Sequence, residues 1–116
     1  MAQLKCGTVA SFMDTIAPKK LAEDWDNVGL IVGDGSSSVN KIMISLDLPA
    51  WVVEEAIENN VDMIVTHHPL IFSPLKKINT DSVIGKKIIK LIKNNISVYS
   101  SHTNFDISEG GLNDVF

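Results

Sequence analysis

The chain contains no arginine, and all ten of its basic residues are lysines. It therefore lacks guanidinium groups, which bind phosphate and carboxylate through two parallel hydrogen bonds. Any anion must be held by lysine, by backbone N–H groups or by a metal ion. The net charge of −4 also argues against a nucleic-acid surface, which requires a basic face. We therefore expect no nucleic-acid partner.

Cysteine is almost as scarce, and no apolar run reaches transmembrane length. A single cysteine, Cys6, excludes an internal disulfide and is typical of a reducing compartment. No histidine lies near Cys6 in the sequence, which favours an incidental apolar role over a nucleophilic one. The N-terminal segment also lacks the apolar core of a signal peptide. These absences predict a cytoplasmic protein without a membrane partner.

Four short apolar runs predict strands, at 30–32, 42–46, 63–65 and 96–100. The last three are almost continuously apolar, which is typical of parallel strands covered on both faces. Three helices are expected around them: 9–16, capped by Thr8; one that begins beside Pro49; and one from a Thr80 or Asp81 cap to about Asn94. Each has an apolar stripe at helical spacing. The stripes are Val9, Phe12, Met13 and Ile16; Val52, Val53, Ala56 and Ile57; and Ile84, Ile88, Leu91 and Ile92.

The alternation of strand and helix predicts an α/β fold. Each long connection leaves room for a right-handed β-α-β crossover, so we expect a mostly parallel sheet with helices on both faces. The 116 residues suffice for one domain. The segment 34–38 is expected to be a surface turn, since it lacks the spacing of a phosphate-binding loop. The lysines and glutamates of the helices predict solvated faces rather than binding sites.

Histidine and carboxylate gather where the predicted parallel strands end. The chain has three histidines: His67 and His68 follow one strand, and His102 follows the next, with Asp106 four residues later. The carboxyl ends of parallel strands meet at one edge of a sheet, where ligands bind. Imidazole and carboxylate together suit Zn, Mn, Fe, Ni or Co better than Mg or Ca. We therefore predict a site for two divalent metal ions with His67, His68 and Asp106 as ligands.

Adjacent histidines can diverge toward two neighbouring ions where a strand breaks into a loop. Hydrogen-bonded, purely structural histidines are the alternative, and the second histidine–aspartate segment favours metal over it. Three roles are open to His102: it could bind metal, support Asp106 or a bound water, or transfer protons. We favour the last two and list His102 as the candidate catalytic residue. Asp47, at the end of the first parallel strand, is expected to support the site rather than bind metal.

Four ordered motifs resemble the N-terminal part of the NGG-interacting-factor-three-like (Nif three-like) family, whose bacterial members are often labelled GTP cyclohydrolase 1 type 2 homologues. The motifs are Trp25-Asp26-Asn27-Val28-Gly29-Leu30, Thr66-His67-His68-Pro69-Leu70-Ile71-Phe72, Ser101-His102-Thr103-Asn104-Phe105-Asp106 and Gly110-Gly111-Leu112-Asn113-Asp114. The resemblance implies an α/β fold, a dinuclear metal centre and a ring-shaped homohexamer. It also implies that His67, His68 and Asp106 occupy ligand positions of the family.

The resemblance also implies that more of the metal centre lies outside these residues. Family members are about twice this length or longer, and they complete the centre with a His-x-x-x-Glu pair near their C-terminus, which this sequence does not contain. We therefore expect residues 1–116 to form the N-terminal portion of a single domain, and to be inactive alone. For the full-length family the implied function is a dinuclear-metal-dependent hydrolase, with GTP purine ring opening and formate release as one possible reaction. The alternative is a non-catalytic metal-binding scaffold or a protein-interaction ring.

Overall fold

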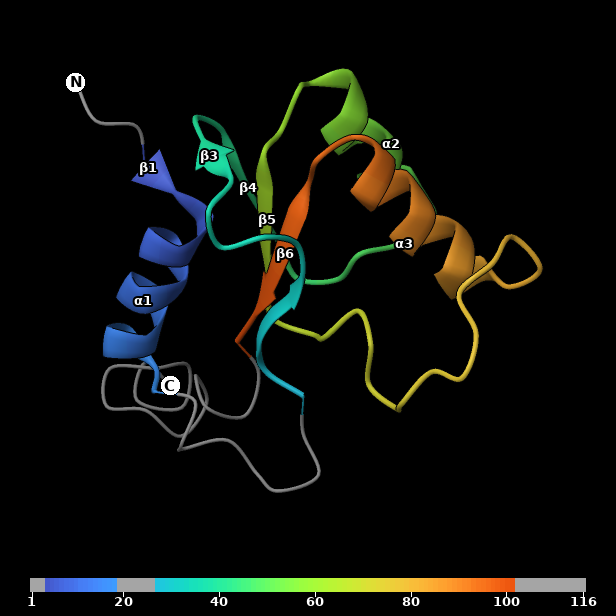
Figure 1. Ribbon diagram of the computed structural model, residues 1–116, viewed down its shortest axis with the longest axis horizontal. Coiled ribbons are helices and arrows are strands. Elements are labelled where there is room, and N and C mark those ends of the chain that lie inside the picture. Colours follow the sequence, from blue (N-terminus) through green and yellow to red (C-terminus); the bar gives the residue numbers. More distant parts are fainter. Residues whose placement is uncertain (1–3, 19–26, 102–116) are drawn as a thin grey trace.

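The computed structural model describes residues 4–18 and 27–101, and these form a sheet between two layers of helix (Figure 1). The elements in chain order are β1 (Leu4–Lys5), α1 (Cys6–Ile16), β2 (Gly29–Val32), β3 (Ser38–Val39), β4 (Ile42–Ser45), α2 (Ala50–Glu58), β5 (Met63–Thr66), α3 (Val83–Lys93) and β6 (Ser97–Ser100). The main sheet has the order β2-β6-β5-β4, and β1 pairs with β3 in a separate ribbon.

The predicted parallel sheet is confirmed. β4, β5 and β6 are parallel neighbours, with Ile44 beside Val65 and Val65 beside Tyr99. α2 and α3 provide the two β-α-β crossovers. β2 runs antiparallel to β6 and closes one edge. As a result, β6, the last of the described strands in chain order, has a neighbour on each side in the sheet.

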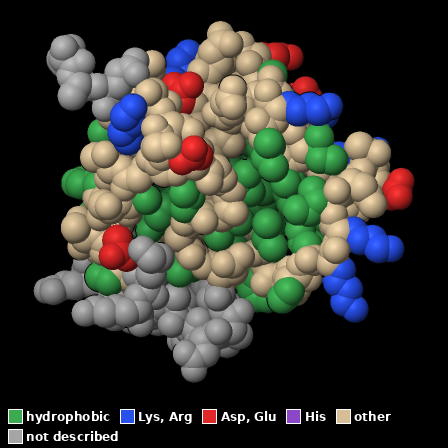
Figure 2. Space-filling view, viewed as in Figure 1, with side chains coloured by type: hydrophobic (Ala, Val, Ile, Leu, Met, Phe, Trp, Pro, Cys, Tyr) green, Lys and Arg blue, Asp and Glu red, His purple; other side chains and the backbone are tan. Residues whose placement is uncertain are grey.

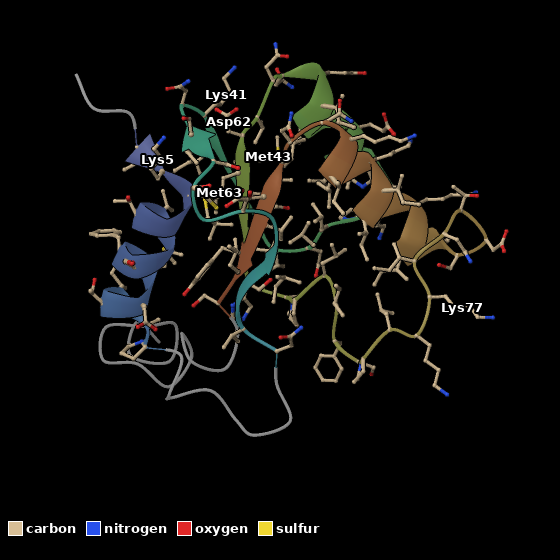
Figure 3. All side chains as sticks on the ribbon, viewed as in Figure 1. Lys5, Lys41, Met43, Asp62, Met63 and Lys77 are labelled. Atoms are coloured by element: carbon tan, nitrogen blue, oxygen red, sulfur yellow. The ribbon has the colours of Figure 1, made fainter. Side chains whose placement is uncertain are left out.

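Helices cover both faces of the sheet, as predicted, because β5 and β6 present alternate residues to opposite sides. Met63 and Tyr99 pack against α1, while Ile64 and Val98 pack against α2 and α3. Figure 1 shows α1 on one side of the sheet and α2 with α3 on the other. Figure 3 shows Met63 on the α1 side, and in Figure 2 hydrophobic side chains gather between the sheet and α3.

One prediction about β4 was wrong: this strand is not covered on both faces. β4 is an edge strand that pairs only with β5 among the described residues. Met43 packs against the α2–α3 cluster, whereas the Ile44 side chain on the other face is 83% exposed. A continuous apolar run cannot tell an interior strand from an edge strand, because both alternate side chains between the two faces.

The details of α1 also differ from the prediction. The helix begins at Cys6 rather than Val9, and Lys5 stands at the capping position without a side-chain hydrogen bond. Thr8 therefore lies inside the helix. Cys6 is buried, with its Sγ 3.9 Å from Met63 Sδ, and this contact extends the apolar face by one turn. Phe12 and Ile16, expected in the buried stripe, are exposed instead.

α2 and α3 lie side by side on the opposite face. Val52, Val53 and Ala56 are buried as predicted, with Pro49 just before the helix. α3 is capped by Ser82, whose Oγ accepts a hydrogen bond from Gly85 N at 3.0 Å, so neither Thr80 nor Asp81 is the cap. Ile88 and Leu91 are buried, but Ile92 is exposed.

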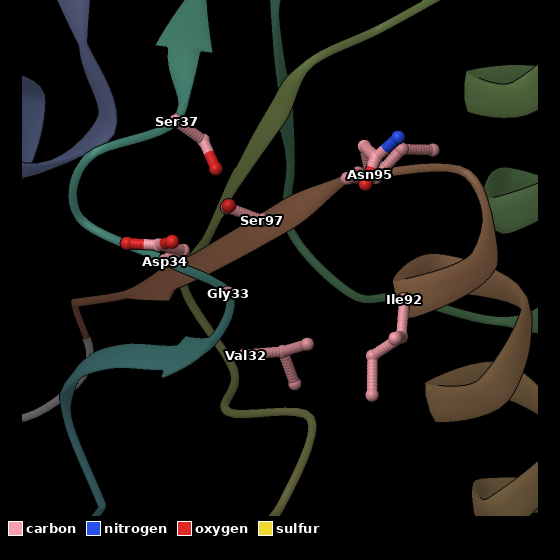
Figure 4. A pocket seen from close by; sticks show the side chains of 8 residues that line it. Val32, Gly33, Asp34, Ser37, Ile92, Asn95 and Ser97 are labelled. Atoms are coloured by element: carbon pink, nitrogen blue, oxygen red, sulfur yellow. The ribbon is translucent and has the colours of Figure 1, made fainter.

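A hollow of about 300 Å³ lies at the amino end of β6, away from the histidines. Its polar lining comes from Asp34, Ser37, Asn95 and Ser97 (Figure 4). The Asp34 carboxylate accepts hydrogen bonds from the backbone N–H and the hydroxyl of Ser36, and these bonds lower the pKa of Asp34. The turn predicted at 34–38 is thus present as far as Ser37, and Ser38 already belongs to β3.

Candidate metal site

The candidate site is built where β5 ends and its backbone continues along β4. β5 ends at Thr66, and His67 and His68 follow directly. The N–H of His67 donates to Ser45 O at 3.3 Å, and the N–H of His68 donates to Leu46 O at 3.0 Å. The bond from His67 continues the parallel β4–β5 ladder by one step, whereas the bond from His68, the next residue, departs from its alternation. Together the two bonds hold both histidine backbones beside the end of β4.

The His67 ring is oriented by the segment that follows β6. Its Nδ1 lies 2.9 Å from the backbone oxygen of Ser101. The Ser101 N–H in turn donates to Thr66 O at 3.0 Å, so Ser101 bridges the ends of the two strands. A carbonyl oxygen can only accept, so His67 Nδ1 carries the proton. In the neutral ring the lone pair is then on Nε2, which is the form that binds metal ions.

The His68 ring is oriented in the same way, by a carboxylate. Its Nδ1 contacts Asp47 Oδ1, and both side chains are largely exposed. A carboxylate oxygen also accepts, so in the neutral His68 ring the lone pair is on Nε2 as well. A carboxylate behind a histidine is the usual support of a metal ligand, because it fixes the ring and raises its basicity. Asp47 therefore lies where the supporting role predicted for it requires.

The two rings lie close enough to serve one centre. Their centroids are 5.1 Å apart and their planes are inclined by 48°. His67 is half-buried, whereas His68 is exposed. Two imidazoles that bind through Nε2 suit Zn, Mn, Fe, Ni or Co, because these ions accept nitrogen ligands.

Two hydroxyl groups near the carboxyl end of β6 are buried without a partner among the described residues: Tyr99 Oη and Ser101 Oγ. Burial, with a smaller contribution from the Asp14 carboxylate, raises the pKa of Tyr99. By contrast, the neighbouring hydroxyls of Thr66 and Ser100 satisfy each other at 2.8 Å. Of these four hydroxyl groups, the two of Thr66 and Ser100 are hydrogen-bonded to each other, and the two of Tyr99 and Ser101 have no partner among the described residues.

The other predicted site residues, His102 and Asp106, lie outside the described residues. Within residues 4–18 and 27–101, no group of three or more His, Cys, Asp or Glu side chains could hold a metal ion. The expectation that His67, His68 and Asp106 form one ligand set therefore stays a prediction. What the structure does bring together is His67, His68 and Asp47, with Ser101 next to His102 in the sequence.

Sequence reasoning missed two supporting residues. Ser101 acts through its backbone oxygen, which residue identity does not reveal. Asn27 donates from Nδ2 to Ile71 O at 2.6 Å and so ties the segment before β2 to the loop after the histidines. The only sequence signal for Asn27 was its place within the motif 25–30.

No helix in the described part of the chain is long and apolar enough to cross a membrane.

Comparison with known proteins shows a family match over most of the chain. The family model described as Duf34/NIF3 (NGG1p interacting factor 3) matches residues 4–116. A Clostridium acetobutylicum relative, called GTP cyclohydrolase 1 type 2 homolog, is 51% identical over 111 residues, which is 96% of this chain and 41% of that protein. A Methanocaldococcus jannaschii relative of the same name is 43% identical over 112 residues, or 45% of that protein.

Solved structures agree with the sequence match. A Bacillus cereus protein related to NIF3 superposes with a TM-score of 0.91 at 42% identity, over 99% of this chain and 32% of that one. Reduced HcgD from Methanocaldococcus jannaschii gives a TM-score of 0.90 at 41% identity, over 98% and 46%. The chain thus spans less than half the length of these relatives. On the family match and these relatives together, the chain belongs to the Duf34/NIF3 family.

Proposed function

We propose that this chain supplies part of the dinuclear centre of a metal-dependent hydrolase, with His67 and His68 as ligands. One observation carries the proposal: an oxygen acceptor holds Nδ1 of each ring, Ser101 O for His67 and the Asp47 carboxylate for His68. A purely structural role at a strand end would not require both histidine rings to be in the same tautomer. Metal ligands do, because each must present the Nε2 lone pair.

Each residue has a distinct part in this proposal. When bound, a pair of divalent cations supplies Lewis-acid activation of water for attack on an electrophilic carbon. His67 and His68 would hold the cations through Nε2, and the Asp47 carboxylate, which contacts His68 Nδ1, would keep that ring in place. Asp106 is the proposed carboxylate ligand and His102 the proposed proton-transfer group. These two roles rest on the family resemblance of the segment 101–106, which begins at Ser101 beside His67.

The substrate proposal follows the relatives. They are called GTP cyclohydrolase 1 type 2 homologues, which suggests attack at C8 of a GTP purine, ring opening and release of formate. Because this chain spans less than half of those relatives, we assign the reaction to a protein of full family length. We propose that such a protein is a cytoplasmic homohexamer, as the resemblance implies.

A non-catalytic metal-binding scaffold is the second candidate. It requires only that His67 and His68, whose ring centroids lie 5.1 Å apart, hold a cation. No arrangement of reacting groups is then needed. Metal would then stabilise the fold by mass action alone, by about 2.7 kcal/mol at a hundredfold excess over Kd.

The first experiment tests metal binding directly. The chain is titrated with Zn²⁺ and with Mn²⁺, and bound metal is measured by calorimetry and elemental analysis. We expect binding that is lost in His67→Ala and His68→Ala, while Lys77→Ala, on an exposed loop (Figure 3), behaves as the parent. Equal binding by the parent and both histidine variants would refute the site.

A second experiment separates the hydrolase from the scaffold. The full-length Clostridium acetobutylicum relative is loaded with metal and incubated with GTP, and the release of formate is measured. The control is the same protein with the histidine that aligns with His68 replaced by alanine. Formate release that depends on this histidine supports the cyclohydrolase. Metal-dependent stabilisation with no turnover of GTP, other nucleotides or phosphoesters supports the scaffold instead.

A further inference from the structure

The hollow at the amino end of β6 lies away from the histidines, which follow the carboxyl end of the parallel neighbour β5. Its lining divides into a polar and an apolar part. Figure 4 shows the Asp34 carboxylate and the hydroxyls of Ser37 and Ser97 gathered on one side of the hollow, apart from Asn95. The apolar lining residues are Val32, Ile92 and Ile96. A polar end opposite an apolar wall is the usual composition of a small-molecule site.

Three oxygen atoms at the polar end have no hydrogen-bond partner among the described residues. Both hydrogen bonds from Ser36 to Asp34 go to Oδ1, which leaves Oδ2 available. Ser37 is bonded only through its backbone. The Ser97 hydroxyl has no partner, although the residue is only 2% exposed and lines the hollow. Because buried hydroxyls are normally paired, an unpaired one that faces a hollow indicates a place where a ligand is received.

The backbone keeps this polar end open and in a fixed shape. Gly33 turns the chain at the end of β2 with a φ of 125°, a conformation that favours glycine. A Cβ at this position would lie 2.2 Å from Ser97 Oγ and would fill the space around that hydroxyl. The turn itself is held by two backbone bonds: Ser37 N–H donates to Asp34 O at 3.0 Å, and Cys6 N–H donates to Ser37 O at 2.8 Å. The three acceptors therefore stand ready before a ligand arrives.

The charge of the lining determines which ligands suit the hollow. The bonds from Ser36 lower the pKa of Asp34, so its carboxylate is ionised at neutral pH. No lysine is among the lining residues, so an anion would be repelled. One carboxylate is too few for a calcium ion, which takes six to eight oxygen ligands, or for a similar cation. A primary ammonium group has three N–H donors and no acceptor, which matches the three available oxygen acceptors.

We propose that this hollow binds a small aliphatic primary amine, with its ammonium group at the polar end and its carbon chain along the apolar wall. Ile92, which is 58% exposed, would be covered by that chain. The volume of about 300 Å³ is at the lower limit of ligand pockets, which restricts the ligand to a few carbon atoms. A free amine and the lysine side chain of another protein share this chemistry. The proposal does not depend on the metal site.

Titration of the isotope-labelled chain, followed by NMR, tests the class of ligand. Isoamylamine should shift the amide signals of 32–37 and 95–97 in a saturable way, with the millimolar affinity expected of so small a ligand. Isoamyl alcohol and isovalerate have the same carbon chain without the ammonium group, and should bind at least about tenfold more weakly. Nα-acetyl-lysine methylamide distinguishes the two sources. Tighter binding than isoamylamine indicates a protein lysine, and weaker binding a free amine.

Two variants test the residues. Asp34→Asn retains an oxygen acceptor for Ser36 but removes the charge, and should weaken isoamylamine binding about tenfold. Ser97→Ala removes the buried acceptor and should weaken it about fivefold. The matched control is Asp81→Asn, the same change at an exposed residue outside the hollow, which should bind like the parent. Isoamyl alcohol that binds as tightly as the amine overturns the proposal. So does unchanged affinity in Asp34→Asn, or a parent that shows no saturable shift.

Discussion

Tyr99 has a hydroxyl group with no described partner, although the residue is almost completely buried. Its ring fills the cluster between α1 and the sheet, together with Met63 and Val9. An unpaired buried hydroxyl costs about 1–3 kcal/mol. Packing of the aromatic ring therefore stabilises the fold at this position, whereas burial of the unpaired hydroxyl destabilises it.

We predict that Tyr99→Phe leaves the free energy of unfolding at pH 7 unchanged or raises it by up to about 1 kcal/mol. The pKa of Tyr99 is raised in the fold, so the unfolded chain loses this proton first. Its contribution to stability is complete below about pH 10 and falls as pH rises through the folded pKa. Urea unfolding from pH 7 to 11 measures both effects. Tyr99 is the only tyrosine, so tyrosinate absorbance reports this residue alone, and a larger alkaline loss in the variant would contradict the argument.

Asp47 offers a second test at the residue scale. We predict that Asp47→Ala weakens Zn²⁺ binding by about 10–100-fold, because His68 loses the group that fixes its ring. Asp47→Asn keeps an oxygen acceptor and should retain more of the affinity, which a merely structural role would not predict. Calorimetric titration measures both, with the exposed Glu55→Ala of α2 as control. Unchanged affinity in Asp47→Ala would show that Asp47 does not support the ligand.

The sequence predicted part of this site. An adjacent histidine pair after an apolar run placed His67 and His68 at a strand end, because strand ends and ligand chemistry are both visible in residue identity. The acceptor for His67 was not predictable, since it is the backbone oxygen of Ser101 and any residue has one. The contact of Asp47 with His68 depended on the register between β4 and β5, which the sequence does not state.

At the scale of elements, α3 shows how tertiary context selects among capping candidates. Thr80, Asp81 and Ser82 could each cap by residue type. Ser82 has an extended backbone and accepts the hydrogen bond from Gly85 N, whereas the N–H of Asp81 donates to Asn79 Oδ1. The conformation of the loop before the helix, rather than residue type, decides where α3 begins.

We predict that Ser82→Ala lowers the free energy of unfolding by about 1 kcal/mol, since it removes the cap of α3. Asp81→Ala, one residue earlier and also exposed, should change it by no more than about 0.5 kcal/mol. Urea unfolding followed by circular dichroism compares the two. If Asp81→Ala proved the more costly change, the cap would lie elsewhere.

Elements whose apolar face meets a single neighbour were the hardest to predict. The stripe of α2 was correct at Val52, Val53 and Ala56, because this helix packs against both the sheet and α3. For α1 the predicted buried stripe was wrong at Phe12 and Ile16, because both side chains are exposed. Periodicity shows that a face is apolar, but the contact partner determines how wide a face is buried.

For the whole molecule, burial is concentrated on two strands. All four residues of β6 are buried, and three of four in β5, while β4 has none. We predict that backbone amides of β5 and β6 exchange hydrogen most slowly and those of β4 and β2 faster, since opening an edge exposes less apolar surface. Amide hydrogen exchange followed by mass spectrometry or NMR measures this order. Protection of β4 equal to that of β6 would contradict it.

The position of β6 between β2 and β5 also has a consequence during synthesis on the ribosome. β2 leaves the exit tunnel early, but its only sheet neighbour in the described chain is translated after α3. At about 5–20 residues per second, β2 waits seconds for that neighbour. The parallel pair of β4 and β5 can assemble first, with α2 across it, and Ser97–Ser100 must then enter between β5 and β2. The nascent chain therefore exposes two apolar strand edges until its hundredth residue has emerged, and in that interval a chaperone would have most to shield.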